Sequence, residues 1–263
     1  SGFLDTCGGF KNILMFDLHK LTLNKKKSEQ FVQGSPLIRF IHEDIIERLL
    51  PIDRVFQNIL LLNPPIENIL SVALKQKYPN HKLTVIDSYT KIPSNKFDLV
   101  IFPMGLHWVN DIQIFLKTIG QSLQPGGVFM ANFFGGGSLQ NLRYKLMELE
   151  STNGMAHAPH ISPFIRFEQL VPLLQQAGFS ENVIDHEVLN IEQDSALGVM
   201  KMLQNIGESN VLKRGISYSI NKNMYKELKH KQQGGFHDHM NLITFLSSPS
   251  QKSIKLKSEH FHG

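Results

Sequence analysis

Cysteine and tryptophan are almost absent from this 263-residue chain, which has one of each. With Cys7 as the only thiol, the chain cannot form an internal disulfide or a thiolate metal cluster, which favours a reducing compartment. No run reaches the roughly 18 to 20 apolar residues that span a bilayer. The longest candidate, residues 59–62, is followed by Asn63, Pro64 and Pro65. We therefore expect no transmembrane segment and a location in the cytoplasm, or in the mitochondrial matrix of a eukaryote.

Excess charge of one sign is also scarce, since the formal net charge is only +4. The lysines gather at residues 25–27 and again at Lys252, Lys255 and Lys257. We interpret both groups as solvated ends of the chain. A nucleic-acid surface would need basic residues interleaved with stacking aromatics, or a known binding motif, and neither group has them. The sequence therefore predicts no nucleic-acid partner.

Metal-ligand patterns are weak as well. His237 and His239 alternate, as do His260 and His262, so each pair could share a strand face. A stable zinc or iron site needs three or four ligands with supporting partners, whereas these pairs lie in a glycine-flanked loop and a polar tail. We expect no metal site.

What the chain does contain is an alternation of short apolar runs and helical periodicity. Four runs suit strands buried on both faces, at residues 59–62, 83–86, 97–102 and 128–133. Apolar residues at helical spacing precede or separate them, at residues 41–50, 66–74 and 112–123. This order is typical of an α/β domain with a doubly wound, mainly parallel sheet. We expect the four strands to be adjacent and parallel, with the fourth beside the third.

Three segments along this core carry a resemblance to a known family. They are residues 97–101 (Phe-Asp-Leu-Val-Ile), 106–111 (Leu-His-Trp-Val-Asn-Asp) and 123–127 (Leu-Gln-Pro-Gly-Gly). Together they resemble the central block of class I S-adenosylmethionine-dependent methyltransferases. Residues 134–139, 159–164 and 207–210 narrow the resemblance to two groups. These are the malonyl-carrier methyltransferases of biotin synthesis and, more closely, the methyltransferase-like assembly factors of respiratory complex I.

The resemblance implies a Rossmann-like fold, S-adenosylmethionine as cofactor and a helical lid over the core. For the assembly factors it implies hydroxylation of an arginine on a complex I subunit, and therefore a protein partner. The expected organisation is a leader and N-terminal arm over residues 1–39, a Rossmann-like core over 40–135, a helical lid with the remaining strands over 136–247, and a polar tail over 248–263. The lid is expected to hold helices near residues 139–149, 167–177 and 196–206 and a strand at 242–246. Residues 4–9 look like a nucleotide turn but lack a preceding strand, so we interpret residues 1–14 as a leader.

Two departures from the family weaken the expected cofactor site. Relatives end the first strand in an acidic, glycine-rich turn, whereas residues 62–68 here contain no glycine and two prolines. Proline has no amide hydrogen and a fixed φ, so it cannot reproduce a glycine loop. Phe97 follows Asp87 by only ten positions, too few for the helix and strand that relatives place there. We therefore predict weak cofactor binding and a sheet that lacks one edge strand.

The candidate cofactor-side residues are Asn63, Asp87, Met104, His107 and Trp108. Asp87 follows the second strand, where an acidic residue binds a ribose diol, although a plain turn aspartate is the alternative. His107 and Trp108 follow the third strand at the edge where open sheets bind ligands. Each has a structural alternative, because Trp108 suits a core, His107 a turn, and Met104 a gap in packing.

The candidate partner-side residues are Phe134, Gly135, Gly136, His160 and Ser162. The glycine segment leaves the fourth strand and is expected to open a helix capped by Ser138, with backbone amides exposed to a ligand. A flexible turn is the alternative. His160 and Ser162 lie between two prolines in a loop that could cover the same pocket. We expect these segments and residues 107–108 to converge on one cleft.

Three functions remain open from the sequence. The first is a methyltransferase-like enzyme related to complex I assembly, with a degenerate cofactor loop. The second is a non-catalytic assembly or binding module, a pseudoenzyme on the same fold. The third is a malonyl-carrier-protein O-methyltransferase of biotin synthesis. The proline turn and the short interval after Asp87 favour the second, whereas the outer motifs favour assembly-factor ancestry.

Overall fold

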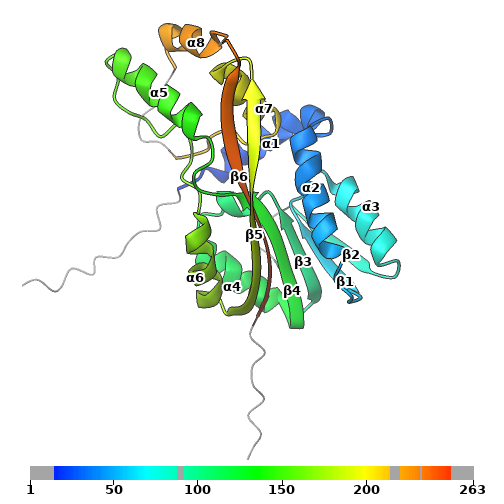
Figure 1. Ribbon diagram of the computed structural model, residues 1–263. Helices are drawn as coiled ribbons and strands as arrows, with labels where there is room; N and C mark the ends of the chain where they lie inside the picture. Colours follow the sequence, from blue (N-terminus) through cyan, green and yellow to red (C-terminus); the bar gives the residue numbers. More distant parts are fainter. Residues whose placement is uncertain (1–14, 88–91, 214–219, 232, 250–263) are drawn as a thin grey trace, which may run out of the picture.

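The computed structural model describes residues 15–87, 92–213, 220–231 and 233–249. Its centre is a six-stranded sheet in the order β2-β1-β3-β4-β6-β5 (Figure 1). The strands are β1 (Asn58–Leu62), β2 (Lys82–Ile86), β3 (Phe97–Pro103), β4 (Leu123–Phe134), β5 (Phe179–Gln193) and β6 (Phe236–Pro249). The expected leader over residues 1–14, residues 250–263 of the expected tail, and with them Cys7, His260 and His262, lie outside the described residues.

Eight α-helices and one short 3-10 helix accompany the sheet in the described part of the chain. They are α1 (Leu18–Val32), α2 (Pro36–Leu49), α3 (Glu67–Lys77), η1 (Leu106–Trp108), α4 (Ile112–Ser122), α5 (Gln140–Thr152), α6 (Phe167–Gln176), α7 (Ala196–Asn205) and α8 (Lys222–Lys229). Among the described residues, none of these helices combines the length and apolar character needed to cross a bilayer.

The four predicted core strands are adjacent and parallel, as the apolar runs indicated. Ile59 of β1 pairs with Leu83 of β2 on one side and Leu99 of β3 on the other. Leu99 in turn pairs with Val128 of β4. Within the described residues, β1 is the only partner of β2, so the sheet lacks the extra edge strand, as predicted. Residues 88–91 of the short interval lie outside the description, and residues 92–96 form no strand.

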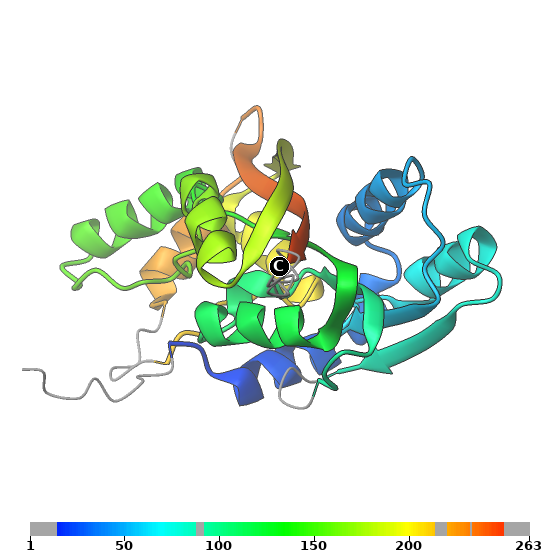
Figure 2. The same cartoon turned by 90° about the horizontal axis from the view of Figure 1, so that it is seen from below.

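Helices cover both faces of the parallel strands (Figures 1 and 2). Because side chains alternate along a strand, Ile59 and Leu61 of β1 pack under α2 and α3, whereas Leu60 and Leu62 face α4 and α6. All four side chains are fully buried. This two-sided burial is what the continuous apolar run of β1 required.

The two C-terminal strands form a long antiparallel pair that the sequence predicted only in part. β6 pairs with β4 over residues 242–247, but with β5 along almost its whole length. The pair therefore extends beyond the parallel strands towards α7 (Figure 1). We expected no strand at β5, because it has no continuous apolar run and leaves Val183 and Val188 exposed. An edge strand of this kind is supported by its neighbour more than by its own burial.

The N-terminal boundaries also differ from expectation. The predicted helix at residues 41–50 begins at Pro36, because the Ser35 hydroxyl accepts a hydrogen bond from the Ile38 amide. A further helix, α1, lies in the segment interpreted as an arm, and the Asp17 carboxylate caps it by accepting from the Lys20 amide. α1 lies at the carboxyl ends of the parallel strands, where the turn after β1 meets it.

Candidate functional site

Two cavities lie on either side of one buried acid, Glu208, which lines both. The first, here called the turn cavity, has a volume of about 480 Å³ and lies between α1, the Asn63–Pro64–Pro65 turn and Asp87. The second, here called the aromatic cavity, has a volume of about 340 Å³ and is bounded by Trp108, Phe164 and the leucines of α5. Volumes of this size suit small ligands or single side chains.

The turn after β1 follows a sharp path without glycine. Asn63 adopts φ +43°, a left-handed conformation that asparagine tolerates better than most residues, and its amide donates to the Ile86 carbonyl. Pro64 and Pro65 come next and line the turn cavity. Asn63 therefore supplies the chain reversal that glycine provides in relatives, while the prolines leave this turn with fewer backbone donors.

The position of Lys25 corrects our interpretation of residues 25–27 as a solvated run. Lys25 lies on α1, and its Nζ atom is buried in the wall of the turn cavity without a hydrogen-bond partner among the described residues. Burial lowers the pKa of Lys25, and the negative charges of Glu208 and Asp87 oppose that shift. Lys26 and Lys27 are exposed, as expected. Helical spacing places one lysine of the three inward and two outward.

Glu208 is the centre of a buried polar cluster. Its Oε2 atom accepts a hydrogen bond from Trp108 Nε1 at 2.9 Å and lies 2.7 Å from His107 Nε2. The side chains of His107 and Glu208 are 0% and 4% exposed. Both donors approach the same oxygen, so neither engages Oε1. The His107 Nδ1 atom is buried and has no hydrogen-bond partner in the described part of the chain.

Aromatic rings surround this cluster. The His107 ring lies 4.9 Å from Trp108, 5.6 Å from Phe134 and 5.3 Å from Phe164, measured between centroids. Phe16 packs edge-on against Trp108 at 5.4 Å. In such a low-dielectric setting a carboxylate interacts more strongly with any cation that reaches it.

The loop carrying His160 and Ser162 forms another wall of the aromatic cavity. His160 Nε2 lies 2.6 Å from the fully buried Glu150 carboxylate. Ser162 bonds to the Asn210 side chain, whose amide also donates to the His160 carbonyl. Asn210 therefore joins this loop to the segment that holds Glu208, and the structure brings His107, Trp108, Phe134, His160 and Ser162 around one region.

The glycine segment after β4 is arranged differently from our expectation. The Gly135 and Gly136 amides donate to the Asn241 and Ile165 carbonyls, so neither is open to a ligand. Ser138 does not cap α5. That helix begins after Leu139, and the Asp238 carboxylate accepts from its Asn141 and Leu142 amides. The Ser138 hydroxyl accepts from the Asn241 amide instead. Gly136 faces a separate hollow near Arg166, outside both cavities.

Met104, another candidate, is fully buried with φ +52°, and its amide donates to Asn132. It packs in a core cluster with Phe134 and Ile66 and lines neither cavity. Asp87, by contrast, is exposed at the end of β2 and lines the turn cavity beside Asn63. Of the five cofactor-side candidates, two line the turn cavity (Asn63 and Asp87), two belong to the Glu208 cluster (His107 and Trp108), and Met104 lies in the core.

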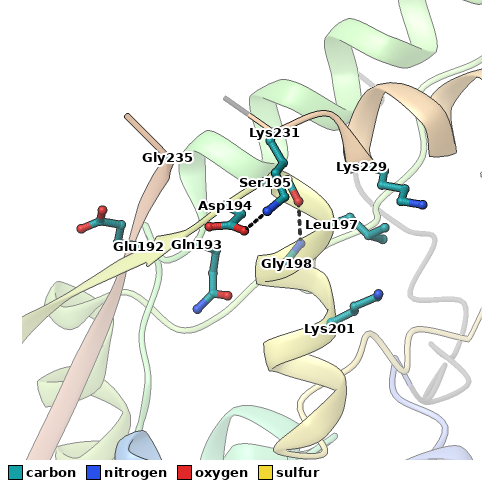
Figure 3. A pocket seen from close by; sticks show the side chains of 10 residues that line it. All are labelled: Glu192, Gln193, Asp194, Ser195, Leu197, Gly198, Lys201, Lys229, Lys231 and Gly235. Atoms are coloured by element: carbon teal, nitrogen blue, oxygen red, sulfur yellow. Dashed lines mark hydrogen bonds and ion pairs between the residues drawn. The ribbon is translucent and has the colours of Figure 1, made fainter. Parts of the chain in front are cut away.

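A larger hollow, of about 840 Å³, lies near the start of α7 (Figure 3). Lys201, Lys229 and Lys231 surround it, but Lys231 is already paired with Asp194 at 2.6 Å, and both side chains are more than 70% exposed. Ser195 uses its hydroxyl to cap α7. Because the Lys231–Asp194 pair is exposed and the Ser195 hydroxyl is used as a helix cap, these groups do not define a ligand site.

Sequence reasoning missed two residues of the site. Glu208 stood within residues 207–210, which carried part of the resemblance, but no role was assigned to it. Lys25 was interpreted as solvated, together with Lys26 and Lys27. For Lys25 the available signal was helical spacing, since Leu21, Lys25 and Ser28 fall on one face of α1. For Glu208 no local pattern existed, because its partners lie about 100 positions earlier in the chain.

Comparison with known proteins places this geometry in a family. Residues 39–183, more than half of the chain, match a family model described as a methyltransferase domain. A candidate methyltransferase of Rickettsia prowazekii is 43% identical over 178 residues, which is 68% of this chain and 78% of the relative. A mitochondrial arginine-hydroxylase of Rattus norvegicus is 34% identical over 55% of this chain. A malonyl-acyl-carrier-protein O-methyltransferase of Xylella fastidiosa is 29% identical over 44% of it.

The share of each relative that the match covers limits what can be inferred from that relative about this chain. The match spans 42% of the rat hydroxylase and 37% of the Xylella enzyme, so the chain covers less than half of each. The match with the Rickettsia relative spans 78% of that protein, and the family model matches the chain from within α2 to the first residues of β5, which includes the whole parallel core. This chain belongs to the methyltransferase-domain family.

Proposed function

We propose that this chain holds an arginine side chain of a protein partner in the aromatic cavity, beside a weakened S-adenosylmethionine site in the turn cavity. By relation to the arginine-hydroxylases, the proposed partner is a subunit of respiratory complex I. The observation that carries the proposal is the place of Glu208, a buried carboxylate that lines both cavities.

The turn cavity supports the cofactor part of the proposal. Asp87 stands at the end of β2, where a carboxylate can accept hydrogen bonds from a ribose diol. The orphaned Nζ atom of Lys25 leaves a buried donor free for a polar ligand. Pro64 and Pro65, however, have no amides to donate. The residues present fit the cofactor, which when bound supplies a methyl group on a sulfonium, but with fewer contacts than a glycine loop makes.

We therefore expect S-adenosylmethionine to bind with a dissociation constant above about 10 µM. Each lost interaction of 1.4 kcal/mol weakens affinity about tenfold, so a missing donor set moves a micromolar site towards the millimolar range. Isothermal titration calorimetry of the full chain measures this directly. A dissociation constant at or below about 10 µM would show that the proline turn costs the site little.

The aromatic cavity supports the substrate part. A guanidinium is planar, always charged and stacks on aromatic faces, so it suits a cavity walled by Trp108 and Phe164 with a carboxylate at one side. No lysine or arginine lines this cavity among the described residues. A malonyl group carries a negative charge and would meet Glu208 without a compensating cation. This difference favours arginine over a malonyl carrier.

The test compares two peptides, Gly-Gly-Arg-Gly-Gly and its citrulline counterpart, which has nearly the same shape but no charge. We expect the arginine peptide to bind at least about tenfold more tightly, a difference of 1.4 kcal/mol. Glu208→Gln should reduce this ratio towards one. Glu29→Gln is the matched control, because Glu29 lines only the turn cavity. Equal binding of the two peptides by the parent protein would contradict the arginine site, as would a ratio unchanged in Glu208→Gln; both are read from NMR titrations.

A second candidate function is a non-catalytic assembly module, and Pro64 and Pro65 are the observation that favours it. Such a module would keep the aromatic cavity and its partner while the turn cavity loses the cofactor. The two experiments above separate the candidates, since arginine discrimination together with no measurable cofactor binding would identify the module.

A further inference from the structure

The buried ammonium of Lys25 has no hydrogen-bond partner among the residues that the structure describes. Its Nζ atom nevertheless lies inside the wall of the turn cavity. Removing an unpaired charge from water is costly, and a lysine can usually avoid this by reaching solvent. Lys26, the next residue on α1, is exposed. The orphaned ammonium therefore needs an explanation.

The surroundings of Lys25 carry negative charge, but neither carboxylate accepts a hydrogen bond from its ammonium. Glu208 and Asp87 act on it through their charges, and burial lowers its pKa in spite of them. Glu208 already uses Oε2 for His107 and Trp108. Lys25 is thus held in a negative environment without donating a direct hydrogen bond to either carboxylate. None of its three donor hydrogens is used in a hydrogen bond to a described residue.

The formal charges around the cavity define the kind of ligand that fits. Lys25 and Lys26 are positive, while Glu29, Asp87 and Glu208 are negative, which leaves one net negative charge among the lining residues. A ligand with a single carboxylate and an excess of positive charge elsewhere complements this arrangement. S-adenosylmethionine has one carboxylate, one ammonium and one sulfonium, and so has a net charge of +1.

We propose that Lys25 is the anchor for the carboxylate of a zwitterionic ligand in the turn cavity, in place of the amides that Pro64 and Pro65 lack. The inference rests on the cofactor part of the proposed function and adds the residue that holds the ligand's acidic end. A charge-assisted hydrogen bond is about twice as strong as a neutral one. One buried ammonium can therefore replace part of a backbone cradle.

The probes are S-adenosylmethionine and decarboxylated S-adenosylmethionine, which differ only in the carboxylate. Affinities of the full chain for both are measured by NMR titration, which reaches millimolar dissociation constants. We expect the parent protein to bind the first at least about tenfold more tightly than the second. Lys25→Met should bind the two about equally, and Lys25→Arg should keep most of the preference. Lys27→Met is the matched control, since Lys27 is exposed on α1 and does not line the turn cavity.

Thermal unfolding without ligand provides a second readout. Lys25→Met removes an unpaired buried charge, so its Tm should equal or exceed that of the parent, which confirms that altered binding is not a folding defect. Three results would overturn the proposal: a parent protein that binds neither probe or both equally, a preference that survives in Lys25→Met, and tighter binding of both probes by Lys25→Met. The last would identify Lys25 as a plug that competes with the ligand.

Failure of this inference and failure of the arginine site give different results. The arginine–citrulline ratio depends on Glu208 and does not require a ligand in the turn cavity, whereas the carboxylate preference depends on Lys25. Lys25→Met is expected to keep the arginine–citrulline ratio within about twofold of the parent, a difference of less than 0.5 kcal/mol.

Discussion

Replacing Trp108 with alanine is expected to lower the free energy of unfolding by about 3–5 kcal/mol, the usual cost of deleting a fully buried large aromatic. Trp108 is 1% exposed, contacts the Phe16 and Phe164 rings at 5.4 and 5.9 Å, and donates to Glu208. Removing it leaves a cavity where α1, η1 and the 207–212 segment meet. Urea denaturation followed by circular dichroism measures the change.

Two variants calibrate the Trp108 result. Trp108→Phe keeps most of the packing and loses the indole donor, so we expect a smaller loss of about 1–2 kcal/mol. Tyr144→Ala, on the exposed face of α5, removes a side chain that is 64% exposed and should change stability by no more than about 0.5 kcal/mol. A loss below about 1 kcal/mol in Trp108→Ala would show that this ring does not organise the site.

The second large effect is expected from Glu208→Leu, at about 3 kcal/mol. Leucine is similar in size but accepts no hydrogen bond, so the Trp108 indole loses its partner and the buried His107 ring loses its contact with Oε2. An unsatisfied buried group costs about 1–3 kcal/mol. Glu208→Gln keeps one side-chain oxygen and should lose clearly less.

The control for Glu208 is Glu148→Leu on α5. Glu148 is 64% exposed and pairs with Lys145 at the surface, so its replacement should cost no more than about 0.5 kcal/mol. Chemical denaturation of the three variants at one pH gives the comparison. Similar losses in Glu208→Leu and Glu148→Leu would mean that the Glu208 cluster contributes nothing to the stability of the fold.

Together, these variants separate the structural and ligand-binding roles of the Glu208 cluster. Trp108 is too deeply buried to be replaced without disturbing the fold, so it is unsuitable as a test of ligand binding. Glu208→Gln is the better probe, because it removes charge while retaining shape and an acceptor. The peptide experiment therefore relies on Glu208→Gln, and the stability experiment on Glu208→Leu.

The parallel core could be predicted because its signals are local. A strand buried on both faces must be apolar throughout, and the runs at residues 59–62 and 97–102 show this directly. The missing edge strand followed from a count of residues between Asp87 and Phe97. β5 was not predictable in this way, because an edge strand needs only a partner, and β6 provides it from more than 40 residues away.

The site residues likewise include some that the local sequence predicts and some that depend on tertiary contacts. Asp87, His107 and Trp108 could be nominated from the sequence, since residues that end parallel strands gather at one edge of the sheet. Gly135 and Gly136 were expected to expose their amides, and the tertiary structure uses those amides elsewhere. Backbone donors in a glycine segment can bind a ligand only if no neighbouring carbonyl reaches them, and sequence alone does not reveal the neighbour.

By itself, the sequence determined the α/β class, the parallel order of four strands, the family resemblance and the loss of the glycine turn, because each depends on residues close together in the chain. Only the tertiary structure decided that Lys25 points inward and that Glu208 joins His107 and Trp108 between two cavities. A buried charge is defined by what surrounds it, and here those surroundings come from α1, η1 and residues 207–212. Contacts between such distant segments produce no periodic pattern in the sequence of any one of them.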